Sequence, residues 1–388
     1  MHYQHVCLES FGYTLPEEIV TSVEIERRLQ PLYERLRLPE GRLELITGIR
    51  ERRFWDRGTL PSDKSISSAH SAIQAAELDP QRVGAIVHAS VCRDHLEPAT
   101  ACRVHHELGL PAECLVYDLS NACLGILNGI VQIANMIELG QIEAGIVVGT
   151  EGSRQLVETT IDALNSDTTL SRATIKSAIA SLTIGSASCA VLLTHQRLSR
   201  TNNRLLHVAA RAHSAHHELC HSGRDEAVAS GMQPLMQTDS EQLLVEGIAT
   251  GVATFDRFLS DASWKREDLA GTFCHQVGTA HRKRMLESLG LDPERDHSTV
   301  EWLGNTGSAA LPITMALGLS QHDLKQHDLK QRQWQSGARL AMLGIGSGIN
   351  CLMLGLEWQT TRVQGNLESA VPAPHWASQK ATVEQPAG

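Results

Sequence analysis

Aromatic residues are scarce in this chain of 388 residues, where Phe, Trp and Tyr together make up 4%. The core must therefore be built from Leu, Ile, Val, Ala and Met. The sequence also lacks any uncharged apolar run of the roughly 20 residues that a membrane-crossing helix needs. Its first residues, Met1-His2-Tyr3-Gln4-His5, have neither the basic nor the apolar region of a signal peptide. These absences predict a protein without stable membrane insertion.

The chain has no excess of positive charge, because 34 Lys and Arg face 44 Asp and Glu, for a net charge of −10. Such a protein has no overall attraction to nucleic acid, and we expect no nucleic-acid partner. Its nine cysteines are odd in number and widely scattered. That pattern favours a reducing compartment over a disulfide framework, so we expect a cytoplasmic protein.

Strand-like and helix-like segments alternate along the chain. Short apolar runs that suit buried strands occupy residues 83–91, 144–149, 187–193, 338–343 and 351–356. The clearest helix carries Leu244, Ile248, Val252, Phe255 and Leu259 on one face, and Asp239 and Ser240 signal its start. This alternation predicts an α/β fold with largely parallel, buried strands.

Polar composition marks the expected boundaries. Residues 195–204 form a polar stretch near the middle and divide the chain into a first part, 1–200, and a second part, 201–358. Residues 359–388 lose the apolar pattern and contain three prolines, which predicts a mobile tail. Residues 321–330 repeat QHDLK in tandem, a unit too short for a solenoid, and we assign it no function.

Cys123 is the first candidate for chemistry. It lies where a strand pattern, 114–119, runs into small residues and then into a long apolar helix that ends near Leu139. Unpaired N–H groups and the helix dipole at such a junction favour a thiolate, so we expect a lowered pKa. Gly125 and Gly129 would allow other backbone to approach closely. A small buried core residue is the alternative role for Cys123.

Three further segments could supply polar partners for the thiol. His275 ends a strand pattern that begins near Leu269, although a lone histidine is more often structural. Asn305 lies in a turn-rich stretch before a helical run, where a capping role is the alternative. The glycine-rich segment 344–348, which includes Gly346 and Ser347, is either a tight turn or a source of backbone donors for an oxyanion.

Two other groups of residues invite a binding role. His213, His216, His217, Cys220 and His221 have helical metal-ligand spacing but lack a second ligand pair, so we predict no metal site and leave a place near a channel mouth open. Residues 281–284 form the basic run HRKR. Arg282 and Arg284 could attract phosphates, although a solvated helix face is the simpler interpretation.

Taken together, Cys123, His275-Gln276, Gly304-Asn305 and the glycine-rich turn resemble the thiolase superfamily, and within it the ketoacyl synthase III branch. Residues 47–53, TGIRERR, are similar to the N-terminal signature of that branch. The resemblance covers about residues 1–358. It implies a duplicated five-layer αβαβα thiolase fold with the nucleophile in the first half and the His and Asn in the second. Members of the family are usually homodimers.

The same resemblance implies roles for the candidates. Cys123 would accept the acyl group, while His275 and Asn305 would bind a thioester or enolate oxygen and help to move protons. Backbone near Cys123, Gly346 and Ser347 would hold the other oxyanion. Arg50, within the TGIR signature, joins Arg282 and Arg284 as a candidate for binding coenzyme A. The substrates would be coenzyme A thioesters, with no separate cofactor.

Glu97 distinguishes between reactions within the branch. Decarboxylating synthases usually carry an apolar residue before the proline that is Pro98 here. A malonyl donor forms its carbanion by losing CO₂, whereas an ordinary acyl thioester must lose an α-proton to a positioned base. Burial beside a lipid channel would raise the pKa of such a carboxylate. Otherwise, Glu97 merely precedes a helix that Pro98 opens.

With Glu97, the sequence resembles the acyl-CoA condensing thiolases of bacterial long-chain olefin biosynthesis. The resemblance implies a non-decarboxylative Claisen condensation of two fatty acyl-CoAs to a 2-alkyl-3-ketoacyl product, released as a β-keto acid. It also implies a homodimer in which Glu97 serves the partner's site, and downstream olefin-pathway enzymes as partners. A pyrone-forming ketosynthase, a decarboxylating 3-oxoacyl-ACP synthase III and a non-catalytic thiolase-fold subunit are the alternatives.

Overall fold

The computed structural model describes residues 1–223, 236–320 and 334–366. The QHDLK repeat and residues 367–388 of the expected tail lie outside the described residues. Residues 359–366 are described, and the short strand β15 (Val363–Gly365) pairs with β1 (Val6–Thr14) in parallel. The amide of Asn366 exchanges two hydrogen bonds of 2.8 Å with the backbone of Leu15. The expectation of a mobile tail from residue 359 is therefore wrong for these residues, because backbone pairing holds a segment whose sequence is polar.

Ten strands of the main sheet run in the order β12-β11-β13-β14-β8-β1-β7-β6-β4-β5, with β15 beside β1. In the first half, the strands after β1 are β4 (Ala85–Ala89), β5 (Leu115–Leu119), β6 (Ala144–Glu151) and β7 (Ala187–His195). In the second half they are β8 (Arg204–Ala212), β11 (Leu269–Cys274), β12 (Asp296–His297), β13 (Ala338–Gly346) and β14 (Asn350–Trp358).

The two halves repeat one arrangement. Numbered along the chain, the five main-sheet strands of each half lie side by side in the order first, fifth, fourth, second, third. A pair that is parallel in one half is parallel in the other, and the same holds for the antiparallel pairs. The halves meet where Cys7 of β1 pairs with Arg204 of β8, and an isolated bridge joins His2 with His207. The expected α/β fold is confirmed, but the prediction of largely parallel strands is wrong, because β7 and β14 run antiparallel to both neighbours. The sequence of a strand that is buried on both faces is a continuous apolar run, and such a run does not show whether the strand lies parallel or antiparallel to its neighbours.

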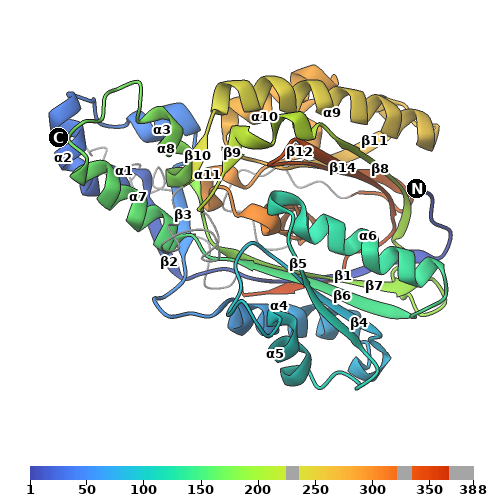
Figure 1. The fold of residues 1–388 in the computed structure, drawn as a ribbon. Coiled ribbons are helices and arrows are strands. Elements are labelled where there is room, and N and C mark those ends of the chain that lie inside the picture. The colour runs from blue at the N-terminus through green and yellow to red at the C-terminus, as the bar shows by residue number, and fades with distance from the viewer. Residues whose placement is uncertain (224–235, 321–333, 367–388) are drawn as a thin grey trace, which may run out of the picture.

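Helices and sheet halves stack as five layers, which Figure 1 shows from bottom to top. Helices α4 (Pro61–Ala76) and α5 (Thr100–Glu107) cover the outer face of the first half. Helices α6 (Gly125–Glu138) and α12 (Ala310–Leu319) fill the middle layer, and all ten residues of α12 are buried. Helices α9 (Ser240–Ala262) and α10 (Thr279–Leu289) cover the second half. This confirms the predicted αβαβα fold.

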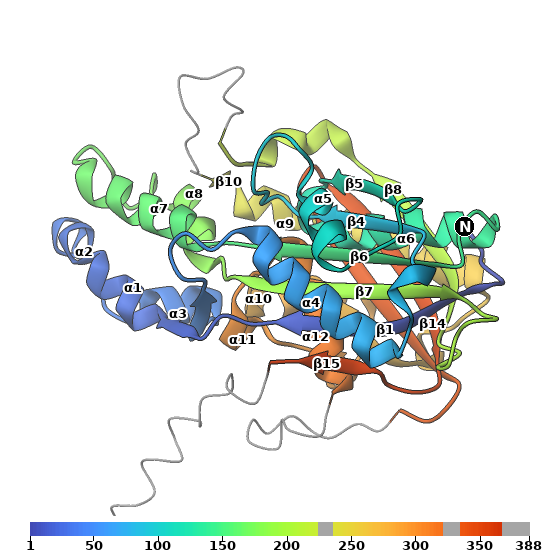
Figure 2. The ribbon, with the colours of Figure 1, turned by 90° about the horizontal axis from the view of Figure 1, so that it is seen from below.

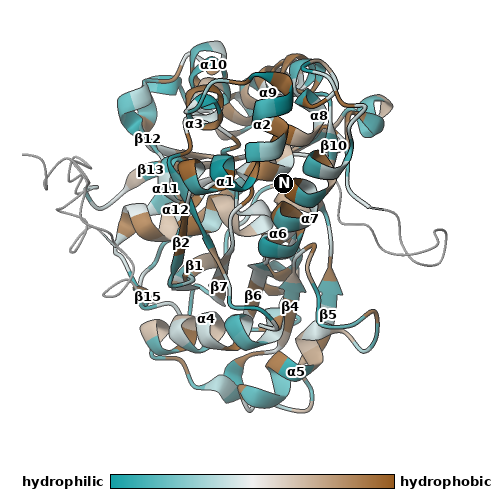
Figure 3. Cartoon of the chain, turned by 90° about the vertical axis from the view of Figure 1, so that its left-hand side faces the viewer, coloured by the Kyte–Doolittle hydropathy of each residue, from teal (hydrophilic) through white to brown (hydrophobic). Residues whose placement is uncertain are grey.

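A lobe of shorter elements extends from one end of the layers, at the left of Figures 1 and 2. It contains β2 (Glu18–Thr21), α1 (Ser22–Arg28), α2 (Gln30–Leu36), α3 (Arg42–Thr47), β3 (Glu51–Phe54), α7 (Arg154–Ser166) and α8 (Lys176–Ile179). Its helices show both hydrophobic and hydrophilic residues in Figure 3. Their apolar side chains, among them Leu29, Leu32 and Ile161, form a small core of their own. Among the described residues, no helix is both long and apolar enough to span a membrane.

Candidate active site

Cys123 lies at a sharp change of direction between β5 and α6. The short 3₁₀ helix η2 (Ala122–Leu124) joins the two elements, and Ala122 has a left-handed φ of 44°. The following helix packs tightly, as its glycines predict. A Cβ atom on Gly129 would lie 2.5 Å from the Val147 side chain, and one on Gly125 would lie 3.3 Å from the Ala89 carbonyl oxygen. The turn and these close approaches hold Cys123 at the start of the middle layer.

The thiol of Cys123 is not activated by its position alone. Its pKa is raised to about 12, mainly by burial and also by the nearby Cys220 and Glu151, although hydrogen bonds from the N–H groups of Cys123 and Ser347 act in the opposite direction. The expectation of a lowered pKa is wrong, since desolvation of a buried thiolate outweighs the helix N-terminus. Cys123 is thus a neutral thiol in the free protein, and a base must accept its proton when it reacts.

His275 directly follows β11, and its backbone N–H donates to the carbonyl oxygen of Leu343 in β13 at 3.0 Å. Both ring nitrogens are buried and have no hydrogen-bond partner within the described part of the chain. Burial lowers the pKa of His275 to about 4. The side chain is therefore a neutral imidazole that can accept a proton at one nitrogen and donate from the other.

Asn305 is fixed by its backbone and by its own amide. Its N–H donates to Thr183 at 2.9 Å, and its carbonyl oxygen accepts from Gly185 at 2.9 Å. The side-chain Oδ1 accepts from the N–H of Gly307 at 3.1 Å. Because the oxygen is engaged, the NH₂ end of the amide is the end that can donate to a bound ligand.

The elements that carry these three side chains meet around the end of β13. Helix η2 packs against β13 and against η8 (Gly307–Ala309), which follows Asn305. A Cβ atom on Gly346 would lie 3.6 Å from that of Cys123, and the N–H of Ser347 reaches the Cys123 sulfur. The turn at residues 347–349 therefore supplies the backbone donor that the sequence predicted for this region. A thiol, an unpartnered neutral imidazole and backbone N–H donors can together perform acyl transfer.

Near the thiol, the sequence analysis missed Glu151, and it named Cys220 only as a member of the histidine cluster. Glu151, at the end of β6, accepts from the hydroxyl of Ser308 at 2.5 Å and from the N–H of Val91 at 3.2 Å. Cys220 accepts from the hydroxyl of Ser347 at 3.5 Å. A carboxylate directly after a buried strand is a recognisable signal, whereas nothing in the local sequence places Cys220 beside the glycine-rich turn.

Glu97 lies outside this cluster of contacts. It is exposed on the segment between β4 and α5, where the first N–H groups of α5 donate to the Asp118 carboxylate at 2.8 and 2.9 Å. Within the described chain, the Glu97 side chain forms no hydrogen bond or ion pair. The burial expected for Glu97 beside a lipid channel is therefore not provided by a single chain.

The three arginines considered for coenzyme A have different positions. Arg282 is committed to the buried Asp296 carboxylate, to which its Nε donates at 2.6 Å, and it also donates to the Asp296 carbonyl at 2.9 Å. This ion pair uses its charge within the fold and argues against substrate binding, which for Arg282 stays a prediction. Arg284 is exposed on α10, and Arg50 is exposed opposite Glu301 at 3.7 Å. Both remain able to meet a phosphate.

The histidine cluster separates in three dimensions. His213 and His216 approach Glu246 of α9, whereas His217 is exposed and His221 contacts the carbonyl of Glu218 at 3.3 Å. The sequence analysis missed Glu246 because α9 lies beyond the segment that carries the histidines. The strongest metal-ligating group of the described residues is thus His213, His216 and Glu246.

The duplicated fold and this site define a thiolase-type condensing enzyme, and comparisons with known proteins agree. Residues 61–188 match the model of the thiolase N-terminal domain, and residues 259–358 match that of the 3-oxoacyl-[acyl-carrier-protein] synthase III C-terminal domain. The chain belongs to the acyl-CoA:acyl-CoA alkyltransferase family. It is 42% identical to such an enzyme from Shewanella oneidensis and 31% identical to one from Xanthomonas campestris, covering 92% of this chain and 100% of each relative.

Solved structures of OleA from Xanthomonas campestris share the fold. One superposes with a TM-score of 0.83 at 30% identity, covering 92% of this chain and 98% of that chain, and it has bound cerulenin. Another contains lauric acid and lauroyl-CoA, with a TM-score of 0.82 at 31% identity, and covers 92% and 100% of the two chains.

Proposed function

We propose that this protein condenses two long-chain fatty acyl-CoAs without decarboxylation and releases a β-keto acid for olefin biosynthesis. The observation that carries the proposal is the buried Cys123 thiol, met by two backbone N–H groups, in a fold that places an unpartnered neutral His275 beside the same strand end. The relatives named acyl-CoA:acyl-CoA alkyltransferase support the substrate class.

In the first step, the sulfur of Cys123 attacks the carbonyl carbon of one acyl-CoA. The thiol proton passes to neutral His275, and the tetrahedral oxyanion is held by the N–H groups of Cys123 and Ser347. Collapse of the intermediate breaks the bond to coenzyme A, whose sulfur takes up the proton. The acyl group is then a thioester on Cys123.

In the second step, a carboxylate takes the α-proton of the second acyl-CoA. We assign this base to Glu97 of the partner subunit. The enolate oxygen is bound by His275 and by the NH₂ group of Asn305. The α-carbon attacks the Cys123 thioester, the Cys123 sulfur leaves and regains a proton in balance with the one that Glu97 removed and then gives up. Hydrolysis of the 2-alkyl-3-ketoacyl-CoA gives the β-keto acid and coenzyme A. No separate cofactor is required.

A comparison of spacing supports the role of Glu97. Structures of Xanthomonas campestris OleA have been solved with one cysteine and, in other variants, one glutamate replaced. The number of residues between that glutamate and that cysteine is the same as between Glu97 and Cys123 here.

Features of the surface support the homodimer that this role of Glu97 needs. Leu96, next to Glu97, is 57% exposed, and β5 ends the sheet with half-buried residues along its length. A sheet edge of this kind is a template for pairing with a second copy. Chromatography coupled to light scattering tests the dimer, and a monomer at working concentration would remove the assignment of Glu97 to a partner site.

Arg50 and Arg284 are exposed and are our candidates for meeting the phosphates of coenzyme A. The lobe also encloses a small apolar pocket between α2 and α3 on one side and α7 and α8 on the other. At about 30 Å³ this pocket is too small to hold a long acyl chain, so it does not carry the proposal.

The cysteines support a cytoplasmic location, because all nine are free thiols. Enzymes that consume a β-keto acid on the way to an olefin would be the downstream partners.

The deciding experiment is mass spectrometry of products from the purified protein given one long-chain acyl-CoA and no malonyl donor. We expect a β-keto acid, or the ketone left after its spontaneous decarboxylation. Accumulation of acyl-Cys123 without product, followed by product once malonyl thioester is added, would identify a decarboxylating synthase instead. A pyrone as the main product would change the assigned substrates.

A further inference from the structure

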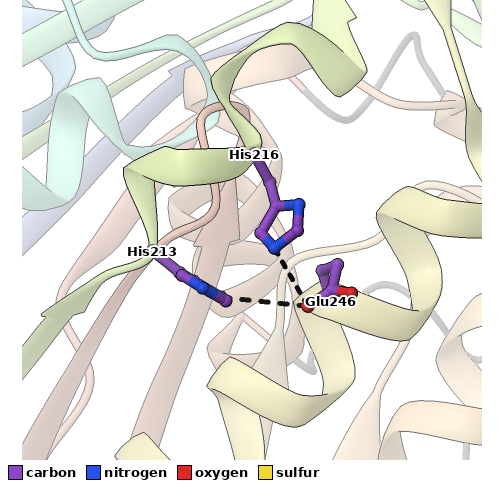
Figure 4. A group of neighbouring side chains, drawn as sticks. All are labelled: His213, His216 and Glu246. Carbon is purple, nitrogen blue, oxygen red and sulfur yellow. Dashed lines mark ion pairs between the residues drawn. The ribbon is translucent and has the colours of Figure 1, made fainter.

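Three side chains that could bind a metal ion lie near the glycine-rich turn, apart from the candidate catalytic residues. His213 follows β8, His216 lies three residues later in the 3₁₀ helix η4 (Ser214–Leu219), and Glu246 projects from α9 toward both. Figure 4 shows the two imidazoles and the carboxylate converging. The Nδ1 of His213, the Nε2 of His216 and a carboxylate oxygen of Glu246 all lie within 4.8 Å of one another.

The distances fit the edges of a metal coordination sphere. The Oε2 of Glu246 is 3.3 Å from the Nε2 of His216 and 3.8 Å from the Nδ1 of His213. A tetrahedral Zn²⁺ ion with bonds of about 2.0–2.1 Å separates its ligand atoms by about 3.3 Å. One edge already has this length, and a small rotation of the more exposed His213 ring would shorten the other.

The carboxylate is held in an orientation that suits a ligand. The side-chain amide of Gln242, one turn earlier on α9, donates to the Oε1 of Glu246 at 2.8 Å. This leaves Oε2 as the oxygen that faces both histidines. Hydrogen bonding to the second atom of a ligating group is the usual way in which proteins orient metal ligands.

We propose that His213, His216 and Glu246 form a binding site for a divalent transition metal ion such as Zn²⁺. Two imidazoles and one carboxylate are ligands that Zn²⁺ accepts readily, and they leave a fourth position to water. The ligands are partly exposed, so an ion can reach them from solvent. A simple imidazolium–carboxylate pair is the competing explanation, and it predicts no stoichiometric binding of metal.

A bound ion would stabilise the segment that packs against the turn at residues 347–349. The N–H of His213 donates to the carbonyl of Ile349 at 2.8 Å, in the turn that contains Ser347. Four residues after His216, Cys220 accepts from the Ser347 hydroxyl. An ion that ties η4 to α9 therefore stabilises the segment packed against the donor turn, and it takes no part in the acyl-transfer steps.

Calorimetric titration of the full-length, chelator-treated protein with ZnCl₂ tests the proposal. The experiment uses a Cys123→Ser background, because the active-site thiol could itself bind zinc. We expect one ion per chain, and each of the substitutions His216→Ala and Glu246→Gln to weaken binding by at least about tenfold. His217→Ala, an exposed histidine of the same segment, is the matched control and should bind zinc unchanged.

Spectroscopy of the Co²⁺-substituted protein gives a second measurement. Nitrogen and oxygen ligands predict d–d bands without the thiolate charge-transfer band that Cys220 would add. The proposal is overturned if zinc binds only weakly and without stoichiometry, if binding survives both ligand substitutions, or if the thiolate band appears. Thermal unfolding of each variant without metal shows whether the loss of binding is separate from loss of the fold.

Discussion

The two halves of this molecule have the same strand order and directions, yet they contribute different chemistry. In the first half, the connection from β5 to the buried helix α6 carries Cys123. In the second, the corresponding connection from β12 to α12 carries Asn305, and the end of β11 carries His275. The repeated scaffold thus carries the proposed nucleophile in one half and the proposed oxygen-binding groups in the other.

The connections between the last two strands of each half differ as well. Between β6 and β7, residues 152–186 hold α7 and α8 and line one side of the small apolar pocket in the lobe. Between β13 and β14, residues 347–349 make a tight turn whose Ser347 N–H meets the thiol. The same pair of strands is therefore joined by a long connection that builds part of the lobe in the first half, and by a short turn beside Cys123 in the second half.

The largest effect is expected for Cys123→Ser, which removes the first half's nucleophile. Acylation by a long-chain acyl-CoA should fall by at least about a thousandfold, because an alcohol is a far weaker nucleophile than a thiol. Intact-protein mass spectrometry measures the acyl adduct. Cys220→Ala is the matched control, and an adduct that vanishes there but persists in Cys123→Ser would reassign the nucleophile.

His275→Ala should separate the tasks of the halves. Condensation should fall by about a hundredfold or more, since both a proton acceptor and an enolate donor are lost, whereas slow acylation of Cys123 should remain detectable. Burst and steady-state rates measured with one acyl-CoA distinguish these steps. Equal loss of acylation and condensation would mean that His275 acts in the first step alone.

Glu97→Ala should leave acylation intact and lower condensation by about a hundredfold. The physical reason is that removing an α-proton needs a base, whereas forming the acyl-enzyme does not need this carboxylate. The exposed Glu107→Gln on the adjacent helix is the control. Loss of the acyl adduct in the Glu97 variant would undo the assignment.

Arg282→Ala tests the structural role of a second-half residue. Leaving the Asp296 carboxylate buried without its partner should cost about 3–5 kcal/mol of unfolding free energy. Denaturant titration measures this loss, and Arg284→Ala, exposed on the same helix, should change stability little. A raised KM for acyl-CoA without loss of stability would return Arg282 to substrate binding.

The smallest effect is a pH dependence to which two buried histidines of the second half contribute. Burial lowers the pKa values of His207 and His275 to about 4 from an ordinary 6.5, so the unfolded chain binds their protons more readily. Stability is therefore full above pH 6.5 and is lost as the pH falls toward 4, by on the order of 3 kcal/mol for each histidine. Unfolding free energies of His275→Asn should depend less steeply on pH over that range. An unchanged slope would contradict the neutral, buried state of His275.

Much of the fold was predictable because its signals are local. The strand at 187–193 and the helix that carries Leu244 to Leu259 follow from apolar periodicity, and both were found. The directions of β7 and β14 were not predictable from the sequence. Both strands are buried on both faces, so they lack the alternation of apolar and polar residues that is typical of an antiparallel sheet with one exposed face. The strand at 363–365 was missed since its stability comes from pairing with β1, which a sequence window does not contain.

By itself, the sequence determined the order of strands and helices and the residues from which a thiol, an imidazole and an amide could be recruited. Only the tertiary structure decided which of them meet, what their pKa values are, and which arginine forms an ion pair with a buried carboxylate. Glu151 and Glu246, and the place of Cys220 beside Ser347, came to light only there, because each acquires its contacts from residues far away along the chain. Burial and long-range contact set the charge of a side chain, and neither is a property of its neighbours in sequence.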